Sequence, residues 1–273
     1  MLTSQTRTIL ADAPQRVAPT RRTGADRHDD AFSVVTYGRS EEAWEGFESY
    51  IKTLITTRNL RSVCDIGGGA NPLLDRQFIE ARGLDYTVLD ISEAELAKAP
   101  GPYHKVAADI ASRNFPVSRT FDIVVSKMLA EHVRDGEQFH RNVLSLLNDD
   151  GLAVHFFPTL YSFPFVANWL VPERVALALH RLLAARDPYQ YAKFPAYYRW
   201  CRGPTGAQIE RLRAIGYDVL EYRGYFGHAG YYRKLGSLRR VHAVKTDYLV
   251  RNPNPHFTSY AQVVLSKPPL SVR

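Results

Sequence analysis

Three consecutive glycines between a hydrophobic run and a proline are the residues best suited to hold a ligand. Residues 63–72 read VCDIGGGANP, and Gly67, Gly68 and Gly69 follow what we expect to be a short buried strand. Glycine adopts positive φ angles and has no Cβ, so such a turn can bring backbone close to a ligand. Pro72 suits the first turn of a following helix, where its missing N–H costs nothing. This order of strand, glycine turn and helix is typical of nucleotide-like binding sites in α/β domains.

Acidic residues end the next two hydrophobic runs. The run 86–90 ends in Asp90, 21 residues after Gly69, and the run 106–110 carries Asp109. In dinucleotide folds, an acid at about 20 residues from the glycine turn accepts hydrogen bonds from a ribose diol. A single aspartate could instead be a helix cap or a surface carboxylate. Together, however, the two acids and the turn fall at the carboxyl ends of successive strands, where α/β sheets bind ligands.

Two histidines are candidates for a general base. His132 follows Glu131 at an expected helix start, and His155 lies inside the hydrophobic run 151–157. Imidazole titrates near neutral pH, so either side chain could accept a proton from a substrate. A structural role is the alternative for His132, and strand alternation leaves open which way His155 points.

The hydrophobic pattern predicts the elements that position these residues. A helix over residues 40–55, with Ser40 as its N-cap, is expected first, and another is bounded by the capping residues Thr205 and Gly216. Strands alternating with helices imply right-handed βαβ units. We therefore expect an α/β fold, a Rossmann-like, doubly wound, mostly parallel seven-stranded sheet. Its strands are predicted at 63–66, 86–90, 106–110, 121–126, 151–157, 217–222 and 259–266.

In order and spacing, these motifs resemble class I S-adenosylmethionine (SAM)-dependent methyltransferases over roughly residues 36–158. The sequence departs from that family at Asn71, where a third glycine is common, and at Ala130, where leucine is usual. The resemblance implies a Rossmann-like enzyme that binds SAM and transfers its methyl group. The matching residues are, in chain order, Asp65-x-Gly67-x-Gly69, Asp90, Asp109 and Glu131-His132-Val133.

The resemblance also implies roles for individual residues. Asp65 would favour the ammonium group of SAM, Asp90 would accept both ribose hydroxyls, and Asp109 would accept from the adenine amino group. The side chain of Ile110 would pack beside the adenine ring, and Tyr37 would line the entrance. Ser126 and Lys127 would contact the methionine end through backbone groups. The expected cofactor-binding set is Tyr37, Asp65, Gly67, Gly68, Gly69, Asp90, Ile91, Asp109, Ile110, Ser126 and Lys127, and no metal is expected.

Composition agrees with an enzyme that has a sizeable core. The chain has 273 residues, of which 45% are hydrophobic. Its two cysteines allow neither a disulfide framework nor a Cys-x-x-Cys metal site, which favours a cytoplasmic location. Residues 1–30 are polar and rich in arginine, so we expect a disordered basic tail followed by a methyltransferase domain over 31–273.

Two insertions in this domain are expected to decide the acceptor. Residues 151–172 contain no charged side chain, and prolines interrupt them, so they predict an apolar helical cap over about 158–203 and no membrane span. A basic aromatic insertion is expected over about 223–252, which contains seven Lys or Arg residues and a single acidic residue, Asp247. It could bind an anionic substrate, acidic lipid or nucleic acid, or be a solvated helix face.

We predict O-methylation of a small or lipid-linked molecule, such as a sugar or a secondary metabolite, because small-molecule pockets are mostly apolar. The alternative is an RNA or protein methyltransferase that uses residues 223–251, although nucleic acid is the less favoured partner. A second alternative is a SAM-binding or membrane-surface protein without methyl transfer. Peripheral membrane contact is compatible with the first prediction as well.

Overall fold

A computed structural model describes residues 34–101, 103–116, 118–160, 195–227 and 236–269. The expected tail, most of the expected cap and residues 228–235 of the expected basic insertion lie outside these ranges. Within the described ranges, no helix is both long enough and apolar enough to cross a membrane.

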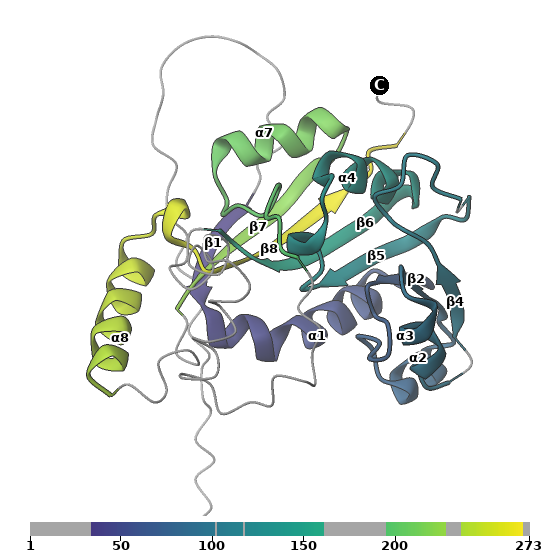
Figure 1. The fold of residues 1–273 in the computed structure, drawn as a ribbon, viewed down its shortest axis with the longest axis horizontal. Helices are drawn as coiled ribbons and strands as arrows, with labels where there is room; N and C mark the ends of the chain where they lie inside the picture. The colour runs from purple at the N-terminus through teal and green to yellow at the C-terminus, as the bar shows by residue number, and fades with distance from the viewer. Residues whose placement is uncertain (1–33, 102, 117, 161–194, 228–235, 270–273) are drawn as a thin grey trace, which may run out of the picture. The chain divides into compact units, whose positions relative to one another are not determined.

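The central element is one sheet of eight strands, in the order β1-β7-β8-β6-β5-β2-β3-β4 (Figure 1). Strand β8 runs antiparallel to its neighbours β6 and β7, and the other pairs are parallel. The mostly parallel, doubly wound sheet is confirmed, but the expected number of seven strands is wrong. The strands are β1 Val34–Arg39, β2 Ser62–Ile66, β3 Asp85–Asp90, β4 His104–Ala107, β5 Phe121–Lys127, β6 Leu147–Pro158, β7 Asp218–Phe226 and β8 Tyr260–Ser266.

The additional strand is β1, which pairs in parallel with β7 at the edge of the sheet. Residues 223–226 of the expected basic insertion belong to β7. Strand β4 ends at Ala107, so Asp109 lies in the following loop and not in the strand. The helices are α1 Ser40–Thr57, α2 Arg76–Arg82, α3 Glu93–Lys98, α4 Gly136–Ser145, α7 Gly206–Ile215 and α8 Gly236–Arg251, with short 3-10 helices η1 Ala130–His132 and η3 Pro255–Phe257.

Helix starts differ from two expectations. Helix α2 begins at Arg76, not near Pro72, because the Asp75 carboxylate caps it by accepting a hydrogen bond from the Phe78 N–H at 2.8 Å. Ser40 is the first residue of α1 and not its cap; the capping position is Arg39, whose side chain makes no capping hydrogen bond to the helix. For α7, the Thr205 cap is confirmed.

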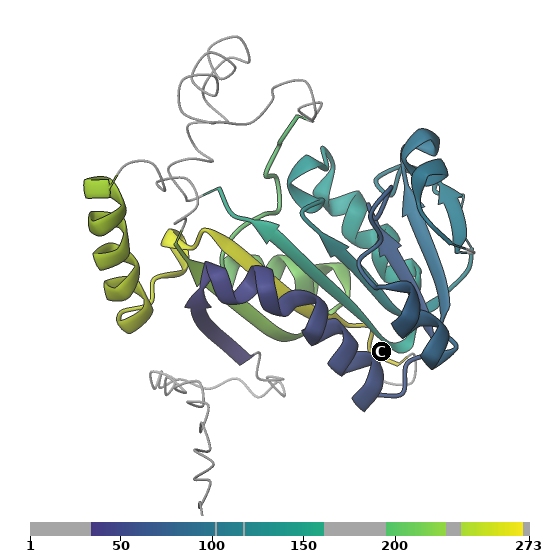
Figure 2. The same ribbon diagram turned by 90° about the horizontal axis from the view of Figure 1, so that it is seen from below.

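The sheet is covered on both faces, with α1 on one face and α7 on the other (Figure 2). Strand β6 shows the division, because neighbouring residues point to opposite faces. Phe156 packs against Phe47 of α1 at 5.5 Å between ring centroids. His155 packs against Phe139 of α4 at 5.3 Å. The predicted strand is therefore buried on both faces.

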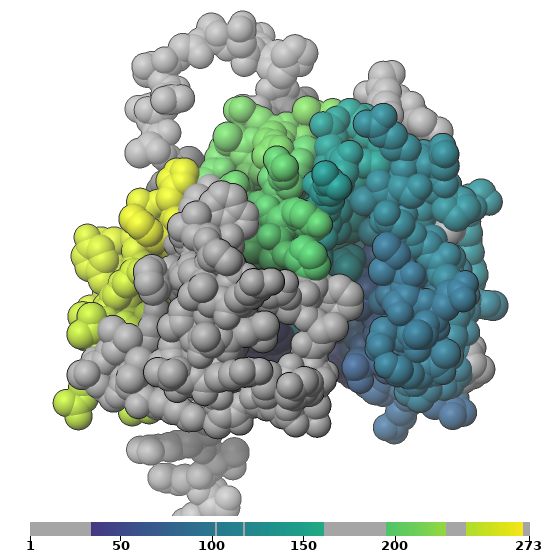
Figure 3. All heavy atoms as spheres, in the orientation of Figure 1, coloured from purple at the N-terminus to yellow at the C-terminus, as the bar shows by residue number. Residues whose placement is uncertain are grey.

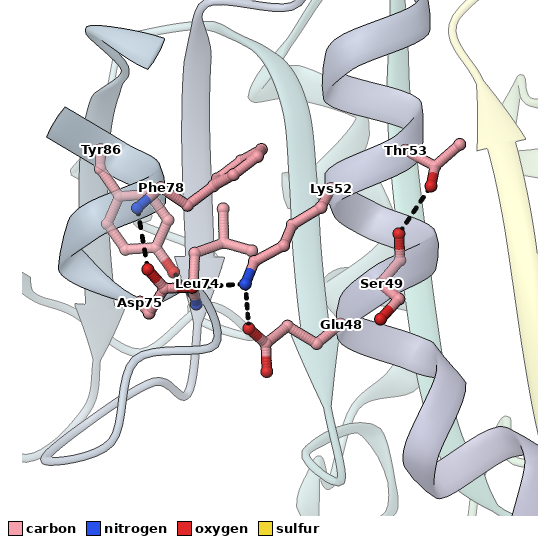
Figure 4. Close-up of polar contacts among 8 residues, drawn as sticks. All are labelled: Glu48, Ser49, Lys52, Thr53, Leu74, Asp75, Phe78 and Tyr86. Atoms are coloured by element: carbon pink, nitrogen blue, oxygen red, sulfur yellow. Dashed lines mark hydrogen bonds and ion pairs between the residues drawn. The ribbon is translucent and has the colours of Figure 1, made fainter. Parts of the chain in front are cut away.

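An ion-pair bridge ties α1 to the segment after the glycine turn (Figure 4). The Lys52 ammonium lies 2.6 Å from Glu48 of the same helix and also pairs with Asp75, the cap of α2. Nearby, the Leu74 N–H donates to the Tyr86 hydroxyl. These contacts attach the loop after the glycines to both α1 and β3.

Candidate functional site

The glycine turn after β2 has a backbone that requires glycine. Gly67 and Gly69 have φ angles of 77° and 42°, in the left-handed region. A Cβ at Gly67 would lie 2.8 Å from a Leu129 methyl group, and one at Gly69 would lie 3.0 Å from the Asp90 carboxylate. The turn is therefore pressed against the ends of its neighbouring strands, with little room for side chains.

The Asp65 side chain supports this turn from the side of the core. Its carboxylate is buried and accepts hydrogen bonds from the Leu73 N–H and the Tyr86 hydroxyl, both at 2.7 Å. Burial raises the pKa of Asp65 to about 6. A Cβ on Gly68 would lie 2.7 Å from the same carboxylate. In this arrangement one carboxylate oxygen of Asp65 holds the loop from the side of the core, and the contact of Asp65 with the SAM ammonium stays a prediction.

Asp90 ends β3 beside the turn, as expected from its position in the sequence. One carboxylate oxygen accepts the Ser92 N–H at 2.9 Å, and the other lies closest to Gly69. The next residue, Ile91, is 70% exposed. A carboxylate and an open apolar side chain at a strand end suit a ribose and the face of a base.

Asp109 and Ile110 lie in the loop after β4 and differ in exposure. Asp109 lines a cavity of about 620 Å³ together with Ala111, Arg134 and other residues near the start of α4. Ile110 is buried, and its carbonyl accepts a hydrogen bond from the Asn142 side chain at 2.7 Å. The Ile110 side chain therefore packs in the core, and the apolar side chains that line the cavity are those of Ala111 and Trp200.

The carboxyl end of β5 is shaped by contacts with β6 and α1. The Ser126 hydroxyl is buried and hydrogen-bonds the His155 ring at 2.8 Å. The Lys127 ammonium lies over the Trp44 ring, 5.3 Å from its centroid. Met128 then has a φ of 56°, an uncommon left-handed conformation for a non-glycine residue. Such strained backbone is frequent at functional sites.

The two histidines differ in their exposure: His132 is partly exposed, whereas His155 is fully buried beside Ser126. The Nδ1 of His132 is 3.0 Å from the Pro195 carbonyl oxygen, and its Nε2 is 3.7 Å from the Glu131 carboxylate. His155 is 0% exposed, and burial lowers its pKa to about 3. The neutral imidazole of His155 is enclosed between Ser126 and Phe139 and cannot reach a substrate that accepts the methyl group. Its position therefore does not support the expectation that His155 acts as a base.

Glu131 is a site residue that the sequence did not single out as a functional group. Its side chain is 3% exposed, and burial raises its pKa to about 8. Its backbone carbonyl accepts hydrogen bonds from the N–H groups of Tyr197 and Tyr198 at 2.7 and 3.1 Å. These bonds hold a segment more than 60 residues further along the chain against the Glu131 backbone, a contact that no local pattern reveals.

Tyr37 lies away from the glycine turn. It stands on β1 and stacks on Phe226 of β7, with 5.6 Å between ring centroids. Five strand spacings of about 4.8 Å separate β1 from β2, or about 24 Å. Tyr37 therefore does not line the entrance to the turn. Trp44 of α1 is the aromatic residue near β5, and it packs edge-on against Phe156 and Tyr260.

Taken together, the glycine turn, Asp90 and Asp109 form an edge that fits an adenosyl ligand. The turn offers close backbone, Asp90 offers a carboxylate oxygen beside Gly69, and Asp109 faces a cavity. The sheet order and this edge define a Rossmann-like methyltransferase of class I.

Comparison with known proteins gives the same class. Residues 2–222 match the family described as a methyltransferase domain. The chain belongs to this methyltransferase family; it is a methyltransferase, and its cofactor is SAM. A comparison of the sequence with curated proteins found no significant match.

Solved structures with a similar fold include three SAM-dependent methyltransferases. The Clostridium acetobutylicum protein is 12% identical with a TM-score of 0.50, over 82% of this chain and 92% of that chain. The Mesorhizobium loti protein is 18% identical with a TM-score of 0.45, over 76% and 91%. The Archaeoglobus fulgidus protein is 17% identical with a TM-score of 0.48, over 83% and 97%. At these identities the likeness concerns the fold alone.

Proposed function

We propose that the protein transfers the methyl group of SAM to a hydroxyl of a small or lipid-linked acceptor, with His132 as the general base. The observation that carries this proposal is the position of the His132 ring at the carboxyl edge of the sheet, between the Pro195 carbonyl and the Glu131 carboxylate. A hydroxyl is a poor nucleophile until a base takes its proton, so an oriented imidazole favours an oxygen acceptor.

The contact with Pro195 decides which ring nitrogen of His132 can act. A carbonyl oxygen only accepts hydrogen bonds, so Nδ1 carries the proton in the neutral ring. The lone pair is then on Nε2, the nitrogen on the side of Glu131. When Nε2 takes the acceptor proton, the ring becomes a cation 3.7 Å from the Glu131 carboxyl group. That cation favours ionised Glu131, whose pKa burial raises to about 8. The buried acid would thus stabilise the charged ring.

In the transfer step, each bond that forms is matched by one that breaks. Bound SAM supplies a methyl group on a sulfonium sulfur, and the acceptor oxygen forms the new bond to carbon as the sulfur–carbon bond breaks. The acceptor proton stays on His132 Nε2 until it passes to solvent, and the proton that Glu131 loses when it ionises beside the charged ring passes to solvent as well. The other residues named here position the reactants, and such positioning supplies much of the rate of a displacement reaction.

An apolar acceptor is supported by the aromatic cluster beside β5. Trp44, Phe156 and Tyr260 pack edge-on or stacked at the carboxyl edge, and Trp44 keeps 41% of its surface exposed. Aromatic side chains are common linings of small-molecule pockets. The uncharged run that follows β6 in the sequence is consistent with the same class of acceptor.

The proposal is tested by incubating the enzyme with methyl-labelled SAM and metabolite or lipid extracts. We expect label in a methyl ether, and a His132→Gln variant that slows transfer by about 10²-fold or more while still binding SAM. His104→Gln, in an exposed histidine of β4, is the matched control and should keep full activity. Label on nitrogen or sulfur, or an unchanged rate in His132→Gln, would contradict the proposal.

A further inference from the structure

Helix α8 exposes a stripe of large apolar side chains. Val241, Val244 and Tyr248 are 66%, 69% and 63% exposed. They are spaced three and four residues apart, so they lie on one face of the helix. A contiguous apolar patch kept in water commonly marks an interaction site. Nothing in the methyl-transfer chemistry described above uses these residues.

The opposite face of α8 is fixed against the sheet, so the direction of the stripe is defined. The helix contacts β1 and β7, and Thr246 and Leu249 are its buried residues. The Asp247 carboxylate is ion-paired with Arg39 at the end of β1. In Figure 1, α8 stands beside the β1 end of the sheet, and in Figure 3 its yellow-green atoms lie at the margin of the face shown.

Basic residues border the stripe on both sides. At 100° per residue, Arg240 and Arg251 lie on one side of the apolar residues and Lys245 on the other. All three are exposed, and in the described part of the chain no acid forms an ion pair with any of them. The one acid of the helix, Asp247, is engaged by Arg39. The outer face is therefore apolar in its centre and positively charged at its borders.

We propose that this face of α8 docks on an anionic lipid surface. Helices that lie in the membrane interface have an apolar stripe that enters the acyl boundary and cations that contact acidic headgroups. RNA would use the cations but gain little from exposed valines. A second copy of α8 paired about a two-fold axis would bring Arg240, Lys245 and Arg251 close to their equivalents. Only an anionic, partly apolar surface satisfies both features.

The position of α8 gives the docking a functional consequence. Arg39 is the last residue of β1 and Gly227 follows the last residue of β7, and α8 contacts both: Asp247 pairs with Arg39, and Thr246 lies 3.3 Å from a Cβ placed on Gly227. The helix therefore stands at the same edge of the sheet as the glycine turn. Docking would bring this edge to the membrane, where a lipid-linked acceptor resides. The inference itself depends on α8 alone and not on the proposed acceptor.

Vesicle binding by the full chain tests the proposal, without SAM or acceptor. The probe is phosphatidylcholine vesicles with or without about 30% phosphatidylserine, in a co-sedimentation assay at low and physiological salt. We expect binding to the anionic vesicles only, weakened by salt. Arg240→Glu with Lys245→Glu should lower the affinity by more than about tenfold, since each cation near the surface contributes roughly fivefold.

Two further variants separate charge from location and from apolar contact. Arg58→Glu with Arg113→Glu changes the net charge equally at exposed sites elsewhere, and should bind nearly as the parent does. Val241→Ser with Val244→Ser keeps the charge and should also weaken binding. Equal loss in the control variant, or no binding to anionic vesicles at low salt, would overturn the proposal. So would RNA binding that needs the cations but not the valines, or a dimer in solution that the serine variant dissociates.

Discussion

Removal of the Asp90 carboxylate is the sharpest test of how the site holds its cofactor. In the structure this carboxylate uses one oxygen to accept the Ser92 N–H, and its other oxygen lies closest to Gly69. A ribose bound at the turn would give its two hydroxyl hydrogens to this group. Asp90→Ala removes both acceptors and leaves the strand itself in place, because β3 is held by β2 and β4 on either side.

The expected loss follows from the strength of charge-assisted hydrogen bonds. Each such bond contributes about 1.5–3 kcal/mol, so the loss of two gives at least about 3 kcal/mol, or roughly 150-fold in affinity. Water that enters the space left by the carboxylate will recover part of this. We therefore expect the Kd for SAM to rise between about tenfold and several hundredfold.

Titration calorimetry with SAM and with its demethylated product, in the presence of a chelator, measures this directly. Asp149→Ala is the matched control, because Asp149 is exposed and its only ion pair described is with Lys267 at 3.7 Å. The Tm of both variants should remain close to that of the parent. A folded Asp90→Ala protein with unchanged affinity would refute the assignment of Asp90 to the ribose. Loss of binding in the presence of chelator alone would refute the expectation of a metal-independent site.

Three further predictions concern stability. Burial raises the pKa of Asp65 from 3.8 to about 6, so the folded state holds the Asp65 proton more tightly than the unfolded state does. The contribution of this group to the free energy of unfolding therefore falls as the pH rises from about 4 to 6. In urea unfolding, the Asp65→Asn variant should lose that pH dependence. Burial lowers the pKa of His155 from 6.5 to about 3, so the contribution of His155 to stability is complete above pH 6.5 and is lost on acidification. The His155→Asn variant should be less sensitive to acid. It should also lose about 2–3 kcal/mol of stability, or roughly 5–10 °C in Tm, and keep the methyl-transfer rate. If transfer stops in a folded His155→Asn protein, His155 is a base after all. Deletion of residues 1–30 should leave Tm and SAM affinity unchanged, and a fall of several degrees in a thermal scan would show that the tail is part of the fold.

The part of the fold that local sequence encodes could be predicted well. The glycine turn needs positive φ at Gly67 and Gly69, and only glycine adopts it at low cost, so the sequence shows the turn directly. Asp90 follows the glycine turn at the expected distance along the sequence, because the βαβ unit has a narrow range of lengths. The methyltransferase family and its cofactor could be inferred for the same reason, since both depend on these local motifs.

Long-range pairing explains the features that the sequence did not predict. Strand β1 has no hydrophobic alternation of its own; it forms by pairing with β7, nearly two hundred residues away. The same pairing places Tyr37 at the far edge of the sheet. His155 faces α4 and not the site because of the register between β5 and β6, which sets Ser126 opposite His155. A single sequence contains no direct signal for such a register.

The same distinction applies within the site itself. The residues that would hold the adenosyl group belong to local motifs, whereas the groups around His132 depend on contacts with residues 195–198. That segment orients the His132 ring through a carbonyl and closes over Glu131 through the N–H groups of Tyr197 and Tyr198. A methyltransferase can keep its cofactor motifs and change its acceptor by changing such a segment, because the two sets of contacts share few residues. Substitutions that change the choice of acceptor should therefore fall at residues 195–202 rather than in the glycine turn.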